Sequence, residues 1–121
     1  MNTIAVLYQD LGQIDTADYY FRQCLDTWEN RAPYISNYFK KDYVGNIISC
    51  GRFNVSIKRQ DEARKLFEKA LAVAREGYEF SRETFAPELV MILDHLAELS
   101  KAEGNEAEEK RYREEAESYQ K

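Results

Sequence analysis

Residues 2–25, NTIAVLYQDLGQIDTADYYFRQCL, contain two short amphipathic segments that meet at GQID. Apolar side chains in both segments recur every three or four residues, which is the spacing of one face of an α-helix. They are Ile4, Ala5, Leu7, Tyr8 and Leu11 in the first segment, and Ala17, Phe21, Cys24, Leu25 and Trp28 in the second and just after it. The stretch predicts two antiparallel helices, and its small residues predict places where the two backbones approach closely.

The same pattern recurs along the chain with a period of 46 residues. The aligned sets are Ala5, Gly51 and Ala97; Gly12, Lys58 and Gly104; Ala17 and Ala63; Phe21 and Phe67; Leu25 and Leu71; and Cys24, Ala70 and Ala116. The third copy of the second helix is degenerate, because Glu109 and Arg113 stand where the alanine and the phenylalanine would be. A repeated arrangement of small and large residues predicts the same helix crossing in each copy.

The periodicity predicts an all-α fold of about six helices, at 2–12, 15–31, 34–58, 61–78, 82–103 and 106–119. Asp15, Asp61 and Asn105 precede three of these helices and are expected to cap them, with Glu108 completing a variant of the capping box after Asn105. Pro33 and Pro87 fit at or near helix starts, where a missing N–H costs little.

These residues resemble the tetratricopeptide repeat family, in which small residues, an aromatic residue and a turn glycine recur at fixed places in a helical hairpin. The resemblance implies a single domain over 1–121 that forms a short right-handed α-solenoid, with units at about 1–31, 34–78 and 82–119. The period departs from the usual 34 residues, so each helix is expected to be longer by a turn or two. The second unit also departs, because Asn54 replaces the first-helix aromatic and Lys58 the turn glycine.

Composition argues against several classes of partner and favours one location in the cell. The net charge of −5 argues against a nucleic-acid partner, which would require a basic surface, and weakly against an anionic membrane. No apolar run approaches the ~20 residues of a membrane span, and no signal peptide is visible. Cys24 and Cys50 fall on apolar helical positions, which favours buried thiols in the cytoplasm over a disulfide, although a disulfide stays possible.

Signals for chemistry are poor. The one histidine, His95, has Asp94 as its neighbour in sequence, but adjacent residues of a helix do not face each other. The acidic stretch 104–117 lacks the ligand spacing of a calcium loop, and no phosphate loop or zinc motif occurs. We therefore expect that the chain has no catalytic residue and binds no metal or cofactor, and that it is not an enzyme.

The resemblance implies that the first helix of each unit lines a concave surface that binds a partner. The outward positions on these helices are Asn2, Val6, Gln9 and Asp10; Ile48, Arg52, Val55 and Ser56; and Asp94, Glu98 and Lys101. Some members of the family hold a C-terminal carboxylate there, but Asp94 and Glu98 would repel an acid, which argues against such a clamp. A groove that is empty, or filled by a neighbouring helix, is the alternative.

The two ends of the chain differ in character. Residue 1 aligns with Ile47 and Leu93, which lie midway along their helices, so the first helix looks truncated. That helix is apolar on more than one side, whereas 106–119 is polar nearly all round and is typical of a closing cap. We expect the N-terminal face to contact either upstream repeats or a second copy of the chain, as a homodimer.

The sequence thus indicates a non-catalytic protein-interaction module, a scaffold or adaptor that binds a peptide or helix of a partner protein. One alternative is a regulatory sensor domain whose groove binds a short peptide and shifts the curvature of the array. Another is an accessory domain to an enzyme on a separate chain.

Overall fold

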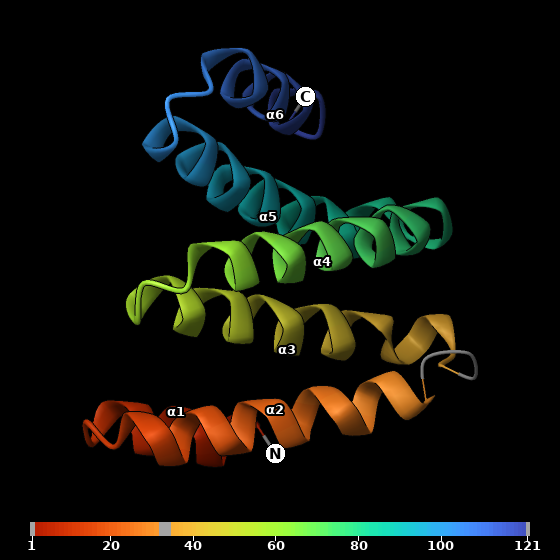
Figure 1. Cartoon of the computed structure of the whole chain (residues 1–121). Helices are drawn as coiled ribbons and strands as arrows, with labels where there is room; N and C mark the ends of the chain where they lie inside the picture. Colours follow the sequence, from red (N-terminus) through yellow and green to blue (C-terminus); the bar gives the residue numbers. More distant parts are fainter. Residues whose placement is uncertain (1, 32–34, 121) are drawn as a thin grey trace. The chain divides into compact units, whose positions relative to one another are not determined.

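A computed structural model describes residues 2–31 and 35–120 of the chain (Figure 1). Over these residues it contains six α-helices and no strand, which confirms the all-α class. The helices are α1 (Asn2–Asp10), α2 (Ile14–Arg31), α3 (Asn37–Ser56), α4 (Gln60–Phe80), α5 (Arg82–Ala102) and α6 (Glu106–Ser118). The predicted start of the third helix at 34 and the expectation for Pro33 lie outside the described residues.

The chain divides into two compact units, and each is described by itself. The first unit, Met1–Ser36, holds α1 and α2, and the second, Asn37–Lys121, holds α3 to α6. The single solenoid domain over 1–121 stays a prediction.

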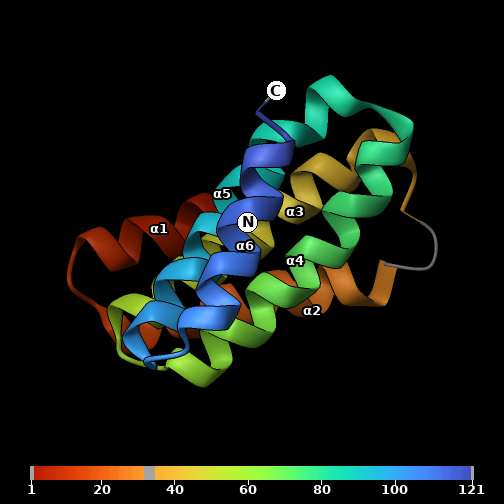
Figure 2. The same cartoon turned by 90° about the horizontal axis from the view of Figure 1, so that it is seen from above.

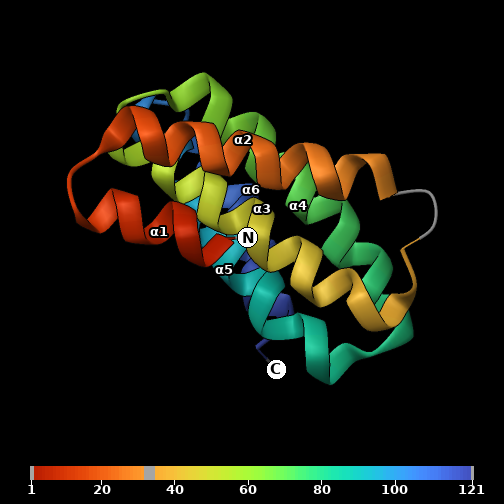
Figure 3. The ribbon, with the colours of Figure 1, turned by 90° about the horizontal axis from the view of Figure 1, so that it is seen from below.

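In the first unit, α1 and α2 form an antiparallel hairpin (Figure 3). Ala5 and Ala17 are fully buried, as expected of small residues at a close approach of two helices. Tyr8 of α1 stacks on Tyr20 of α2, with ring centroids 5.5 Å apart and planes 6° from parallel. Tyr19 points elsewhere and is 57% exposed, because consecutive residues of a helix cannot share one face.

Three tight turns share one backbone geometry. Gly12, Lys58 and Gly104 all have positive φ angles, of 77°, 63° and 77°. The N–H of Gly12 donates to the carbonyl of Gln9 at 3.0 Å, and the N–H of Gln13 donates to the carbonyl of Tyr8 at 2.9 Å. The turns at Lys58 and Gly104 form the same two bonds between equivalent residues. This pattern is the Schellman motif, which satisfies the last carbonyls of a helix.

The predicted helix caps are correct at one site and wrong at two. Asn105 is the N-cap of α6, and its side-chain oxygen accepts a hydrogen bond from the N–H of Glu108 at 3.1 Å. Asp15 and Asp61 do not cap their helices but lie in the first turns of α2 and α4. The helices begin earlier because the Schellman turns place the next helix almost directly after the positive-φ residue. In that first turn, the two carboxylates still interact favourably with the helix dipole.

In the second unit, each helix packs against the next in sequence, and α3 also contacts α5 (Figures 1 and 2). Its core contains large, fully buried side chains at Phe53, Phe67, Phe85, Leu89, Ile92, Leu93 and Leu96. A Cβ atom on Gly51 of α3 would lie only 2.7 Å from Phe67 of α4, so the phenylalanine ring packs directly on the glycine backbone. Gly77 has the same relation to Phe85. Small residues therefore face large ones where helices of this unit meet.

A polar network joins α4 to the connection between α5 and α6. The Arg64 guanidinium donates from Nη1 to Glu108 Oε1 at 2.7 Å and from Nη2 to Glu103 Oε2 at 3.0 Å. The Ser100 hydroxyl donates to the same Glu108 oxygen at 2.6 Å. Ser100 is fully buried, and this bond satisfies its hydroxyl.

Candidate partner-binding surfaces

The helix α1 exposes a row of aliphatic side chains in the first unit. Ile4, Leu7 and Leu11 are 47%, 54% and 61% exposed, and they follow i, i+3, i+7 spacing along the helix and into its turn. Val6, on another side of α1, and Ile14, at the start of α2, are also exposed. We call Ile4, Leu7 and Leu11 the α1 apolar face. Asp10 is the one charged residue between positions 2 and 13, so few charged groups border this apolar surface.

The predicted binding residues on α1 are accessible where they are described. Val6 and Asp10 are exposed, and Gln9 is half-buried. The side chain of Asn2 lies outside the described residues.

On α3, the predicted outward positions are only in part accessible. Arg52 and Ser56 are exposed and Val55 is half-buried. Ile48 is 4% exposed, so the expectation that it faces outward is wrong. Both Ile47 and Ile48 are buried, which shows that α3 is covered on more than one side at this level.

On α5, Asp94, Glu98 and Lys101 are exposed as predicted. Arg113 of α6 donates from Nη2 to Glu98 Oε1 at 2.8 Å, so the Glu98 carboxylate is already paired. Asp94 forms no ion pair with any residue in the described part of the chain.

His95 is a packing residue at this surface. Its ring stacks on Phe67 of α4, with centroids 4.7 Å apart and planes 10° from parallel. The pKa of His95 lies below its usual value because burial disfavours the charged imidazolium and because the positive charge of Arg52 adds to that effect. The carboxylates of Asp94 and Glu98 oppose the shift. These charges influence His95 without providing the hydrogen-bonded partner that a general base requires.

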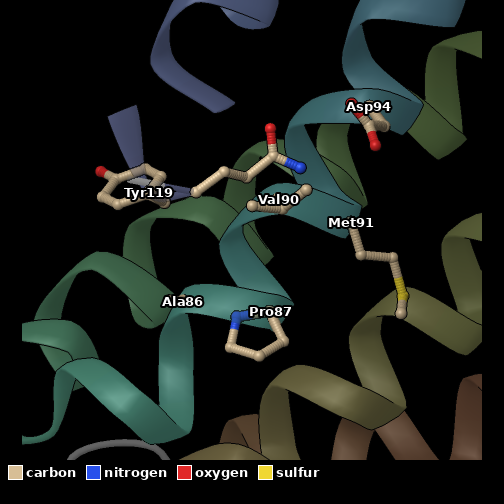
Figure 4. A pocket seen from close by; sticks show the side chains of 7 residues that line it. Ala86, Pro87, Val90, Met91, Asp94 and Tyr119 are labelled. Atoms are coloured by element: carbon tan, nitrogen blue, oxygen red, sulfur yellow. The ribbon is translucent and has the colours of Figure 1, made fainter. Parts of the chain in front are cut away.

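A groove of about 530 Å³ lies along the N-terminal half of α5, beside the end of α6 (Figure 4). We call it the α5 groove. Its lining consists of Ala86, Pro87, Val90, Met91, Asp94, Tyr119 and Gln120. Sequence reasoning found only Asp94 among these residues. The available signal was the apolar run Val90–Leu93, because four consecutive helical residues cannot all face the core.

Residues 1–31, which include both helices of the first unit, match the tetratricopeptide repeat family. The matched residues span the α1–α2 hairpin, which is similar to a tetratricopeptide repeat. Comparison with curated proteins and with solved structures gives no match.

The residues that carried the resemblance have clear places in this repeat. Ala5, Ala17, Phe21 and Cys24 are buried, and Gly12 forms the positive-φ turn between the two helices. Tetratricopeptide repeats are in general protein-interaction elements.

Metal and membrane sites have no support in the part of the chain that the structure describes. Among residues 2–31 and 35–120, no group of three or more His, Cys, Asp or Glu side chains is arranged to hold a metal ion. None of the helices formed by these residues has the length and apolarity needed to cross a membrane.

Proposed function

We propose that the protein is a non-catalytic interaction module, a scaffold or adaptor that binds a peptide or helix of a partner protein. The observation that carries this proposal is the α1 apolar face on the tetratricopeptide repeat. Contiguous exposed apolar surface is uncommon on proteins that act alone and marks interaction sites.

Burial of this face would supply useful binding energy. A fully buried leucine or isoleucine gains about 1.5–3 kcal/mol relative to full exposure. Ile4, Leu7 and Leu11 are each about half exposed, so covering all three offers roughly half of that gain for each. The occupants that fit are an apolar helix face of a partner protein or the same face of a second copy in a homodimer.

The predicted binding residues of the second unit enter the proposal separately from this face. Arg52, Asp94, Glu98 and Lys101 give the second unit exposed charges of both signs, which suit the polar rim of a peptide site. A cytoplasmic location also stays a prediction.

Site-specific photo-crosslinking in cells tests the proposal. A photoreactive amino acid at position 7, on the α1 apolar face, is expected to give discrete crosslinked protein species. The same amino acid at position 110, an exposed site on α6, serves as the control and should give none. A crosslinked species of twice the mass of the chain would identify a homodimer.

Substitution of the face provides the second arm. Leu7→Gln together with Leu11→Gln keeps helix-compatible side chains and removes the apolar surface. Crosslinking from position 4 in this variant should fall sharply. Absence of any crosslink from position 7 in the wild-type protein would refute the proposed use of this face.

A further inference from the structure

The α5 groove exists because α6 is shorter than the helix that it covers. The helix α5 has 21 residues and α6 has 13, and α6 runs back along α5 after the turn at Gly104. The first turns of α5 therefore extend past the end of α6 at Ser118. Figure 4 shows Tyr119 on one side of the opening, with Val90 and Met91 of α5 across from it.

One wall of the groove is held in place by contacts within the second unit. The Tyr119 hydroxyl donates to Glu115 Oε2 at 3.0 Å, and the same carboxylate accepts from Arg75 Nε at 3.2 Å. The Tyr119 ring also packs edge-on against Tyr78, with centroids 5.0 Å apart. Because this wall is already ordered, binding a ligand costs less conformational entropy of the protein. Met91 across the opening is unbranched and can adapt to the shape of a ligand.

The groove is mainly apolar, with Gln120 as a neutral polar residue and Asp94 as its one charged residue. Asp94 is the only ionisable carboxylate in the lining and is exposed without an ion pair in the described residues. The nearby Glu98 carboxylate lies outside the lining and is paired with Arg113 at 2.8 Å, so Asp94 is the carboxylate left to attract a cation here. A ligand that places an apolar group on Val90 and Met91 and a cation at Asp94 matches both features. A lysine side chain does this by itself, because its methylene stem packs on apolar surface while its ammonium group stays at the rim.

We propose that the α5 groove binds a partner peptide in which a lysine or arginine is flanked by an apolar residue. This inference rests on the proposed interaction function and names the chemistry of a partner. It differs from the α1 apolar face in its location, in the second unit, and in its requirement for a positive charge. A peptide suits the site better than an enclosed ligand does, because Pro87, Met91 and Asp94 leave one side of the groove open to solvent.

Fluorescence anisotropy with labelled synthetic peptides tests the proposal. The probe is a capped peptide with a central lysine between leucines, and the matched probes replace the lysine with glutamate or with glutamine. The lysine peptide is expected to bind the full chain best. Asp94→Asn should weaken it by about 1.5-fold to fivefold, the range of an exposed ion pair. Val90→Thr, which keeps the side-chain shape and adds a hydroxyl, should weaken all three peptides alike.

Asp42→Asn is the matched control, because Asp42 is an exposed aspartate of the same unit outside the groove lining. Its affinity for the lysine peptide should equal that of the wild type. Equal binding of the glutamate peptide would overturn the charge requirement. If neither Asp94→Asn nor Val90→Thr affects binding, or if no peptide binds, the proposal that the α5 groove is a peptide site is wrong. Either result would leave the crosslinking test of the α1 apolar face unaffected.

Sedimentation velocity on the same variants separates a peptide from a second copy of the chain. If the wild-type protein is a dimer and Asp94→Asn or Val90→Thr makes it monomeric, the groove is a self-association site and the peptide proposal is wrong. An unchanged sedimentation coefficient, together with weaker peptide binding, supports the proposal.

Discussion

Lys58 adopts a left-handed backbone conformation at a turn where the two equivalent residues, Gly12 and Gly104, are glycines. Its φ of 63° is the only positive value for a non-glycine residue in the described chain. A side chain in this conformation crowds the following carbonyl, which costs roughly 1–2 kcal/mol, whereas glycine has no such penalty. The turn at Lys58 is therefore the most strained of the three.

Lys58→Gly is expected to stabilise the protein. The relief of strain should exceed the extra entropy that glycine gives the unfolded chain, for a net gain of about 0.5–1 kcal/mol in the free energy of unfolding. Urea denaturation monitored by circular dichroism measures the change. Gly104→Ala is the matched control and should destabilise by a similar amount, since it introduces the strain that Lys58→Gly removes. Equal or lower stability of Lys58→Gly would show that the lysine side chain contributes a compensating contact.

His95 gives the protein a stability that depends on pH. Its pKa in the folded state is lower than in the unfolded state, so the fold favours the neutral ring. The contribution is complete above the usual histidine pKa of about 6.5 and is lost as pH falls through that value toward the lower folded pKa. We expect the wild-type protein to lose thermal stability between about pH 7.5 and about pH 5.5.

His95→Phe isolates this contribution, because phenylalanine can keep the stack on Phe67 but cannot take up a proton. The loss of melting temperature over the same pH interval should be smaller in this variant. The pKa of Glu108 is lowered, chiefly by the Ser100 hydrogen bond, from a starting value already below this interval, so its titration does not interfere. An identical pH dependence in both proteins would contradict the assignment.

At the scale of the helices, the network at Arg64 ties three elements together. Arg64 lies on α4, Ser100 near the end of α5, and Glu108 in the first turn of α6. The Arg64 and Glu108 side chains are only 18% and 21% exposed, so solvent screens this pair less than a typical surface pair. Glu103 is 45% exposed and adds little.

Arg64→Lys is expected to destabilise the protein by about 1 kcal/mol, because a single ammonium group cannot span both carboxylates as the guanidinium fork does. Arg111→Lys is the control, since Arg111 is an exposed neighbour 3.9 Å from the same Glu108, and its effect should stay below about 0.5 kcal/mol. Urea denaturation of both variants provides the comparison. Similar effects for the two substitutions would show that the network contributes no more than a surface ion pair.

The helices could be predicted from sequence because hydrophobic periodicity and small residues act locally. Asn105 could be identified as a cap for the same reason. The Arg64 network could not, because it joins residues far apart in sequence. Its central hydroxyl, Ser100, occupies the place that corresponds to Tyr8 in the first repeat and Asn54 in the second copy, where the pattern suggested an aromatic residue.

At the scale of the whole molecule, the exposure of single residues could be predicted from sequence better than the shape of the surface that they form. Asp94 was found because charge on a predicted outward position is visible in the pattern. The α5 groove was missed because it depends on where α6 ends relative to α5, which is a difference in length between two packed helices. Ile48 was wrongly assigned to the outside because period alone does not show how many sides of α3 are covered.

Each of the two compact units contains one buried cysteine, Cys24 in the first and Cys50 in the second. Burial raises the pKa of the Cys24 thiol, which keeps it protonated and slow to react at neutral pH. A thiol-alkylating reagent can modify either residue only after the surrounding structure opens. The alkylation rates of Cys24 and Cys50, resolved by mass spectrometry of peptides, therefore report separately how often each unit opens. The measurement needs no label introduced into the protein.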